Sequence, residues 1–353
     1  MIMKKPITLL SMLILSGCSF AQKEQPEIEY NFPTCGQSIL NGKSVTKVCE
    51  TRDFIALEPR KRKRDWLGFL AAEGSSGYYG PRDSVGAILG FKNQELDMQG
   101  HVWDFSKQDT PNLVLRGYDS VVRNGIILKT YLSLGSNEYL PPNFSTDQSG
   151  PYAKSSNSNN SIENFTISNI KAHTLGVTLN SWGGEVRNSI IILKNNMNIQ
   201  GSKTYIQNNL FISEAKIVQD RYLFTLNKIN KSIALDSSKQ IFPDRSYDKT
   251  AIPNALYIKF SPDTVIDGNT FTLTHKNDQA YAIVLDHSPR VRISNNTFNG
   301  FKVPILMDQW SSIVDKNGKE IKPENFNAYG NTINPNKYAG NVTMNRKGEI
   351  VKE

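Results

Sequence analysis

The chain has 353 residues, of which 38% are hydrophobic and 21% are charged, and its formal net charge at pH 7 is +8. A hydrophobic content this low argues against a compact α/β enzyme and favours an elongated fold, whose surface is large for its volume. The positive charge favours acidic partners, such as an acidic polysaccharide or lipid headgroups.

Residues 1–17 have the composition of an export signal, with Lys4 and Lys5 before an apolar run too short to span a membrane. The segment ends in Leu-Ser-Gly before Cys18 and so resembles a bacterial lipobox, which implies cleavage before Cys18 and its lipidation. Ser19 matches the outer-membrane sorting pattern. Cleavage removes two lysines and no acid, so the formal charge falls from +8 to +6.

These features predict an outer-membrane lipoprotein that faces the periplasm or the cell surface. We expect it to contact the membrane through its lipid anchor only, and we expect no nucleic acid partner in that compartment. The alternative is an ordinary secretory signal in which Cys18 is incidental.

The segment after the signal predicts a tether and a cap. Residues 18–34 are polar and contain prolines, as tethers do. Cys35 and Cys49 are the two cysteines other than Cys18, and in an oxidising compartment they most simply form one disulfide. We expect residues 35–85 to form a disulfide-closed N-terminal cap with a short amphipathic helix over 65–72.

Residues 86–335 carry a repeat of about 20 residues, in which short apolar runs alternate with asparagine corners. The corner residues are Asn169, Asn188, Asn208, Asn269, Asn296 and Asn331. We expect them to be structural, because asparagine tolerates a left-handed corner and stacked amides can form a ladder. The pattern predicts an all-β fold: a single-domain parallel β-helix, or solenoid, with two insertion loops, 136–161 and 227–254, and a polar C-terminal tail over 336–353.

Aligning the windings on this corner predicts a second column of polar residues, each of which follows the last residue of a strand. Its members are Asn180, Gln200, Gln219, Asp286 and Asp308. Neighbouring windings lie about 4.8 Å apart, so Asp286 and Asp308 are expected to be stacked carboxylates. Such a pair needs a cation or a basic neighbour to relieve its repulsion.

Charged residues next to this column form the candidate site. Asp286, His287, Arg290 and Arg292 are candidate catalytic groups, because a polysaccharide lyase needs positive charge beside the uronate carboxylate and a base for the adjacent proton. Asp286 and Asp308 are candidate Ca²⁺ ligands. The alternative is that no cofactor binds and that the aspartates and arginines pair on a solvated sheet face.

Three further residues are candidates for substrate binding. Trp182 and Trp310 lie near predicted strand ends, where an indole can stack on a sugar ring. His173 is a candidate for lining the same face.

The run IVLDHSPRVRISNNTF, residues 283–298, is similar to the repeat of right-handed parallel β-helix proteins of the pectate-lyase-like superfamily. The resemblance covers residues 86–335 and implies a right-handed solenoid whose lateral face binds an extended polymer. Together with export and a basic charge, it implies an acidic polysaccharide partner, with lyase or hydrolase activity if the protein is an enzyme. The alternative is a non-catalytic interaction protein with a protein partner, either an immunity protein against a periplasmic toxin or a surface adhesin.

Overall fold

The computed structural model describes residues 32–55, 86–107, 112–135, 165–215, 231–233, 252–308, 310–321 and 323–353. The expected signal, Cys18, the helix expected over 65–72 and most of both insertion loops lie outside these residues. The described chain is all-β, with one short 3₁₀ helix, η5 (Pro323–Tyr329). None of its described helical segments is long and apolar enough to cross a membrane.

Three stacks of parallel strands make up a 23-stranded mixed sheet, because two long strands, β8 (Ser120–Gly135) and β9 (Phe165–Asn180), pass through all three stacks. The first stack also contains β2 (Lys43–Cys49), β5 (Gln94–Asp97), β10 (Glu185–Arg187), β13 (Tyr205–Gln207), β17 (Val265–Asp267) and β20 (Arg292–Ser294). The second also contains β3 (Phe54–Ile55), β6 (Val102–Asp104), β11 (Ile190–Leu193), β14 (Leu210–Ser213), β18 (Thr270–Leu273), β21 (Thr297–Asn299) and β23 (Thr332–Asn334). The third also contains β4 (Gly86–Lys92), β7 (Asn112–Tyr118), β12 (Met197–Gln200), β16 (Asn254–Lys259), β19 (Tyr281–Asp286) and β22 (Ile305–Met307).

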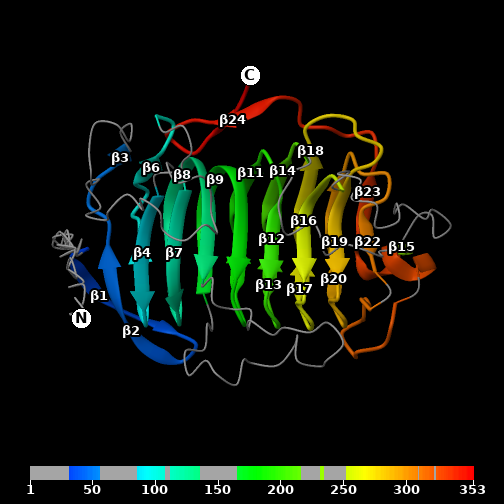
Figure 1. Cartoon of the computed structure of the whole chain (residues 1–353), viewed down its shortest axis with the longest axis horizontal. Helices are drawn as coiled ribbons and strands as arrows, with labels where there is room; N and C mark the ends of the chain where they lie inside the picture. Colours follow the sequence, from blue (N-terminus) through cyan, green and yellow to red (C-terminus); the bar gives the residue numbers. More distant parts are fainter. Residues whose placement is uncertain are drawn as a thin grey trace, which may run out of the picture.

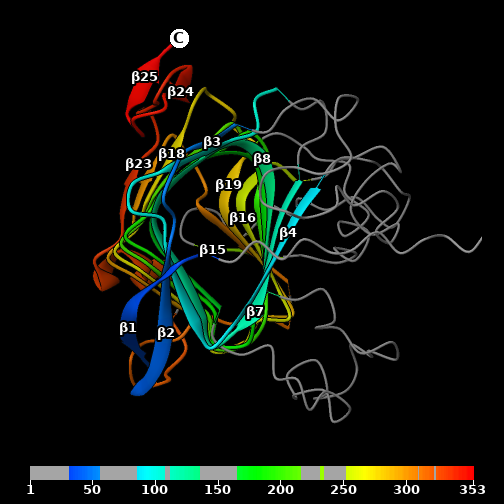
Figure 2. The same ribbon diagram turned by 90° about the vertical axis from the view of Figure 1, so that its left-hand side faces the viewer.

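The chain visits the three stacks in turn, and equivalent residues of successive visits pair with one another. Val186 of β10, for example, pairs with Ile167 on one side and with Ile206 on the other. The windings therefore lie side by side along the long axis (Figure 1), and the view along that axis shows the strands enclosing an interior (Figure 2). This arrangement is compatible with the predicted solenoid.

Antiparallel strands lie against outer strands of the ladder. β1 (Thr34–Leu40) pairs antiparallel with β2, and the predicted disulfide between Cys35 and Cys49 is confirmed. At the other end, β15 (Lys231–Ile233) pairs antiparallel with β22. Both additions occupy backbone groups that an open strand edge would expose to other chains.

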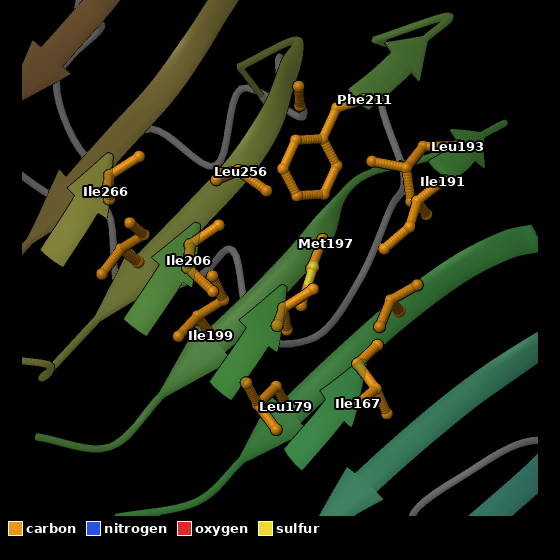
Figure 3. Close-up of a cluster of buried hydrophobic side chains, with 14 of the residues drawn as sticks. Ile167, Leu179, Ile191, Leu193, Met197, Ile199, Ile206, Phe211, Leu256 and Ile266 are labelled. Atoms are coloured by element: carbon orange, nitrogen blue, oxygen red, sulfur yellow. The ribbon is translucent and has the colours of Figure 1, made fainter. Parts of the chain in front are cut away.

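The interior is filled by alternate residues of the strands, as the period-two pattern requires. Figure 3 shows aliphatic side chains such as Ile167, Leu179 and Ile206 meeting in this interior. Phe211 and Phe271 stack with ring centroids 5.1 Å apart, and Phe271 and Phe298 with centroids 5.3 Å apart. Burial of these side chains in register fixes the relative position of neighbouring windings.

The corner asparagines are structural, as predicted, but they form two columns instead of one. Asn169, Asn188 and Asn208 have φ between +52° and +55° and make the left-handed corner. The residue after that corner points inward, and there the amide ladder runs through Asn209, Asn269, Asn296 and Asn331, with amide-to-amide distances of 2.9, 3.0 and 3.3 Å. Asn269, Asn296 and Asn331 therefore occupy the inward position, which follows the left-handed corner residue by one.

The polar tail folds into a hairpin of β24 (Val342–Met344) and β25 (Ile350–Lys352), which lies back over the windings (Figure 1). Met344 packs with Ile126 and Ile192 of the second stack. Arg346 reaches Asp53 and Asp104, at 3.3 and 3.5 Å. The last residues of the chain are thereby tied to the first windings.

Candidate functional site

The third stack carries the polar column that the sequence predicts. β12 pairs with β9 so that Gln200 lies beside Asn180, and with β16 so that Lys259 lies beside Gln200. Lys259 pairs in turn with Asp286. Asp308 follows β22 in the next winding, and the predicted stacking of Asp286 and Asp308 is confirmed.

One predicted member of the column is wrong. Lys259, and not Gln219, lies between Gln200 and Asp286. The connection between β14 and β16 is long, so a fixed spacing counted from Asn208 falls within it at Gln219, which lies outside the described residues. Lys259 and Tyr257, both in β16, cannot be placed from the sequence spacing for the same reason.

Asp286, His287 and Asp308 form a compact cluster at the end of the column. Nδ1 of His287 lies 2.5 Å from Oδ1 of Asp286 and 3.0 Å from Oδ2 of Asp308. The two aspartates are each 1% exposed and His287 is 7% exposed. Among the described residues, Nε2 of His287 has no hydrogen-bond partner.

The other carboxylate oxygens are held by groups outside the cluster. The Tyr257 hydroxyl donates to Oδ2 of Asp286 at 2.5 Å. Oδ1 of Asp308 accepts hydrogen bonds from the Ser311 hydroxyl at 2.6 Å and from the Trp310 backbone at 3.2 Å. Both carboxylates are therefore fixed in orientation, and one oxygen of each is directed at the imidazole.

The three groups shift one another's pKa values. Burial raises the pKa of Asp286, although hydrogen bonds from His287 and Tyr257 and the charge of Lys259 act against this. Burial also opposes ionisation of Asp308, but the hydrogen bond from His287 and those of its other partners lower its pKa overall. Burial disfavours the His287 cation, yet the two carboxylates raise its pKa to about 9.

A left-handed corner places the imidazole against the carboxylates. His287 has a φ of +48°, and Phe260 in the preceding winding has a φ of +47°. This backbone conformation is uncommon for bulky residues, so it needs support from its surroundings. Serines supply it: the Ser261 amide donates to Oγ of Ser288, and the Ser288 amide donates to Oγ of Ser311, both at 3.0 Å.

Aromatic rings enclose the imidazole. The Trp310 indole stacks on His287 with ring centroids 4.2 Å apart, and the Phe260 ring lies 5.1 Å away. Nζ of Lys259 is 4.9 Å from the centroid of the Phe260 ring. Because Trp310 is 46% exposed, an indole surface faces solvent beside the cluster.

The two candidate arginines are exposed, as predicted, but they lie apart from the cluster. Arg290 forms a two-pronged ion pair with Asp263, with Nε–Oδ1 2.7 Å and Nη2–Oδ2 2.8 Å. Arg292 belongs to β20 in the first stack, where it pairs with Val265. The structure therefore brings neither guanidinium to the carboxylate of Asp286.

Trp182 and His173, the other two candidates for substrate binding, also lie away from the cluster. Trp182 is half-buried at the same edge of the third stack, three windings and about 14 Å from Asp286. His173 is 2% exposed in the second stack, with Nδ1 3.1 Å from the Thr343 hydroxyl of the C-terminal hairpin. The structure thus places His173 beneath that hairpin and not on the face with the cluster.

His173 is held neutral where it lies. Burial is the main cause, and the charges of Lys129 and Lys194 act in the same direction, so that its pKa falls to about 4. Nζ of Lys129 is 3.5 Å from Nε2 of the ring.

The donor atoms of the cluster restrict the cation that it could hold. Ca²⁺ takes about six to eight oxygen ligands, whereas one nitrogen and two carboxylates converge here. Imidazole nitrogen with carboxylate suits borderline divalent ions of the first transition row. The predicted Ca²⁺ ligands Asp286 and Asp308 do lie together, but with His287 as the third donor they fit Ca²⁺ poorly.

Comparison with protein-family models, with curated proteins and with solved structures gives no significant match. The functional interpretation therefore depends on the residues and their geometry.

Proposed function

We propose that the protein is a right-handed parallel β-helix, exported and lipid-anchored at the outer membrane, that binds an extended acidic polysaccharide along the edge of its third stack where the strands end. One observation carries the proposal. The in-register column that begins with Asn180, Gln200 and Lys259 leads to the exposed indole of Trp310. Strands in a sheet lie about 4.8 Å apart, so such a column suits a linear polymer better than a compact ligand.

Side chains of the column have unused hydrogen-bonding capacity. Oδ1 of Asn180 and Nε2 of Gln200 are buried atoms that have no hydrogen-bond partner within the described chain. A buried polar atom without a partner costs about 1–3 kcal/mol, which would be recovered if the side chain turned outward to a sugar hydroxyl. Trp310 adds an aromatic surface for the apolar side of a sugar ring.

Charge favours an acidic chain over a neutral one. The formal charge of +8 becomes +6 after the predicted cleavage, because Lys4 and Lys5 are removed. Lys259 lies within the column, next to Gln200, but it is buried beside Asp286, so the favourable charge is that of the chain as a whole. A positive protein concentrates anionic polymers at its surface.

The geometry supports binding more strongly than hydrolysis. Glycoside hydrolases place two carboxyl groups on either side of the scissile bond. Asp286 and Asp308 are each 1% exposed and are occupied by His287, Tyr257 and Ser311. Any acid–base chemistry at this cluster would therefore use Nε2 of His287.

The proposal is tested by titrating the mature chain, with Cys18 replaced by serine to prevent lipidation, with polygalacturonate and with neutral dextran. We expect binding to the uronate polymer and at least a tenfold loss of affinity in Trp310→Ala. The matched control is Tyr131→Ala, because Tyr131 is 42% exposed at the opposite edge of the same stack. Absence of binding across a panel of acidic polymers would overturn the proposal, and absorbance of unsaturated products in the same mixtures reports lyase activity.

A further inference from the structure

Three donor atoms from two neighbouring windings converge on one point. They are Oδ1 of Asp286, Nδ1 of His287 and Oδ2 of Asp308, and all lie within 4.8 Å of one another. We propose that these residues bind one divalent cation of the first transition row, such as Zn²⁺. This inference does not depend on the proposed polymer.

The surroundings of the donors are those of a metal site. In such sites the ligands are oriented by hydrogen bonds from residues that do not touch the metal. Here the Tyr257 hydroxyl binds the outer oxygen of Asp286, and the Ser311 hydroxyl binds the outer oxygen of Asp308. The backbone amide of Trp310 also donates to that oxygen of Asp308, so the inner oxygens remain directed at Nδ1 of His287.

A cation would resolve an electrostatic conflict. Two neighbouring buried carboxylates repel each other, and the charge between their inner oxygens is the single positive charge of the His287 imidazolium. A divalent ion in place of the Nδ1 proton interacts with both carboxylates and with the neutral imidazole at once. The exchange releases the Nδ1 proton to solvent, as metal binding to histidine requires.

The exchange needs only small movements. Tetrahedral ligands at about 2.1 Å from a zinc ion are separated by roughly 3.4 Å. Nδ1 of His287 is now 2.5 Å from Oδ1 of Asp286 and 3.0 Å from Oδ2 of Asp308. Side-chain movements of about 1 Å or less therefore open the triangle enough to accept the ion.

The cluster supplies three protein ligands, one fewer than a tetrahedral zinc ion takes. Three protein ligands around zinc leave a fourth position for water or for an anionic group of a bound molecule, as in catalytic zinc sites. Among the described residues, this is the one group of three His, Cys, Asp or Glu side chains whose donor atoms all lie within 4.8 Å of one another. The site is thus both buried by the chain and incomplete without an outside ligand.

Isothermal titration of the full mature chain, with Cys18 replaced by serine, freed of tags and treated with chelator, tests the site with Zn²⁺, Mn²⁺ and Ca²⁺. We expect one Zn²⁺ per chain, bound at least 100-fold more tightly than Ca²⁺. Asp308→Asn and His287→Ala should each weaken Zn²⁺ binding more than 100-fold, and Tyr257→Phe about tenfold through loss of the outer hydrogen bond. The control Asp263→Asn removes a carboxylate that pairs with Arg290 outside the cluster and should change the affinity less than twofold.

X-ray absorption of the Zn²⁺-loaded chain without ligand substitutions gives a test that does not require the variants to fold. We expect a shell of nitrogen and oxygen at about 2.0–2.1 Å with the signature of one imidazole. The proposal is overturned by a lack of stoichiometric Zn²⁺ binding, by tighter binding of Ca²⁺, by full affinity in both ligand variants, or by a shell without imidazole.

Discussion

Asn208 and Asn209 are adjacent in the chain, yet the structure gives them different roles and therefore different energetic costs on truncation. Asn208 is exposed and has a φ of +55°. Asn209 is 3% exposed, its Oδ1 accepts from the Ser189 amide at 3.0 Å, and its Nδ2 donates to the Val186 carbonyl at 2.8 Å. Asn209→Ala leaves these two buried backbone groups without their side-chain partner.

At about 1–3 kcal/mol for each of the two groups, Asn209→Ala should lower the free energy of unfolding by about 2–6 kcal/mol. Asn208→Ala removes no buried hydrogen bond and places alanine in a left-handed conformation, which costs about 1 kcal/mol. Urea unfolding followed by far-UV circular dichroism compares the two variants with the unsubstituted chain. Equal losses of stability, or a larger loss for Asn208→Ala, would refute the assignment of the inward ladder to Asn209.

Three further predictions concern stability. Phe271→Ala removes the middle ring of a buried stack and should cost about 3–5 kcal/mol in urea unfolding, with Phe271→Leu costing clearly less. Burial holds the pKa of His173 at about 4, below its unfolded value of about 6.5, so stability should fall by up to about 3 kcal/mol between pH 6.5 and pH 4. A His173→Gln variant that kept the whole of this slope would contradict that assignment. The double substitution Cys35→Ser and Cys49→Ser should lower stability by about 3 kcal/mol, measured by thermal unfolding, and no change would argue against the closed loop.

The sequence predicts those parts of the site that lie in windings without insertions. Asp286 and Asp308 each follow an apolar strand in consecutive windings, so their stacking follows from spacing alone. Lys259 could not be placed this way, because the connection between β14 and β16 interrupts the count.

Shifts of one residue at corners of the chain account for two further differences between the predicted and the observed structure. The pair Asn208-Asn209 offers two candidate corner residues, and sequence spacing does not distinguish the one that turns the chain from the one that points inward. Trp310 reaches His287 because the corner after Asp308 is one residue longer than the equivalent corner one winding earlier. Neither offset leaves a signal in hydrophobic periodicity.

The positions of Arg290 and Arg292 show a second reason why spacing in the sequence does not predict the whole site. Arg290 and Arg292 flank the buried Val291, and the sequence predicts them next to the polar column. The turn between β19 and β20 instead carries the chain from the third stack to the first. Arg290 therefore forms its ion pair with Asp263, and Arg292 lies opposite Val265 in the sheet. Closeness in sequence does not imply closeness in space across a solenoid corner.

The most direct test of the central claim measures the affinity of the mature chain for uronate oligomers of increasing length. The edge from Asn180 to the winding that carries Trp310 spans four strand spacings, or about 19 Å. If an extended polymer binds along it, affinity should rise with oligomer length until this distance is covered and should then level off. Equal affinity for a single uronate and for long oligomers, or no binding at any length, would contradict the claim.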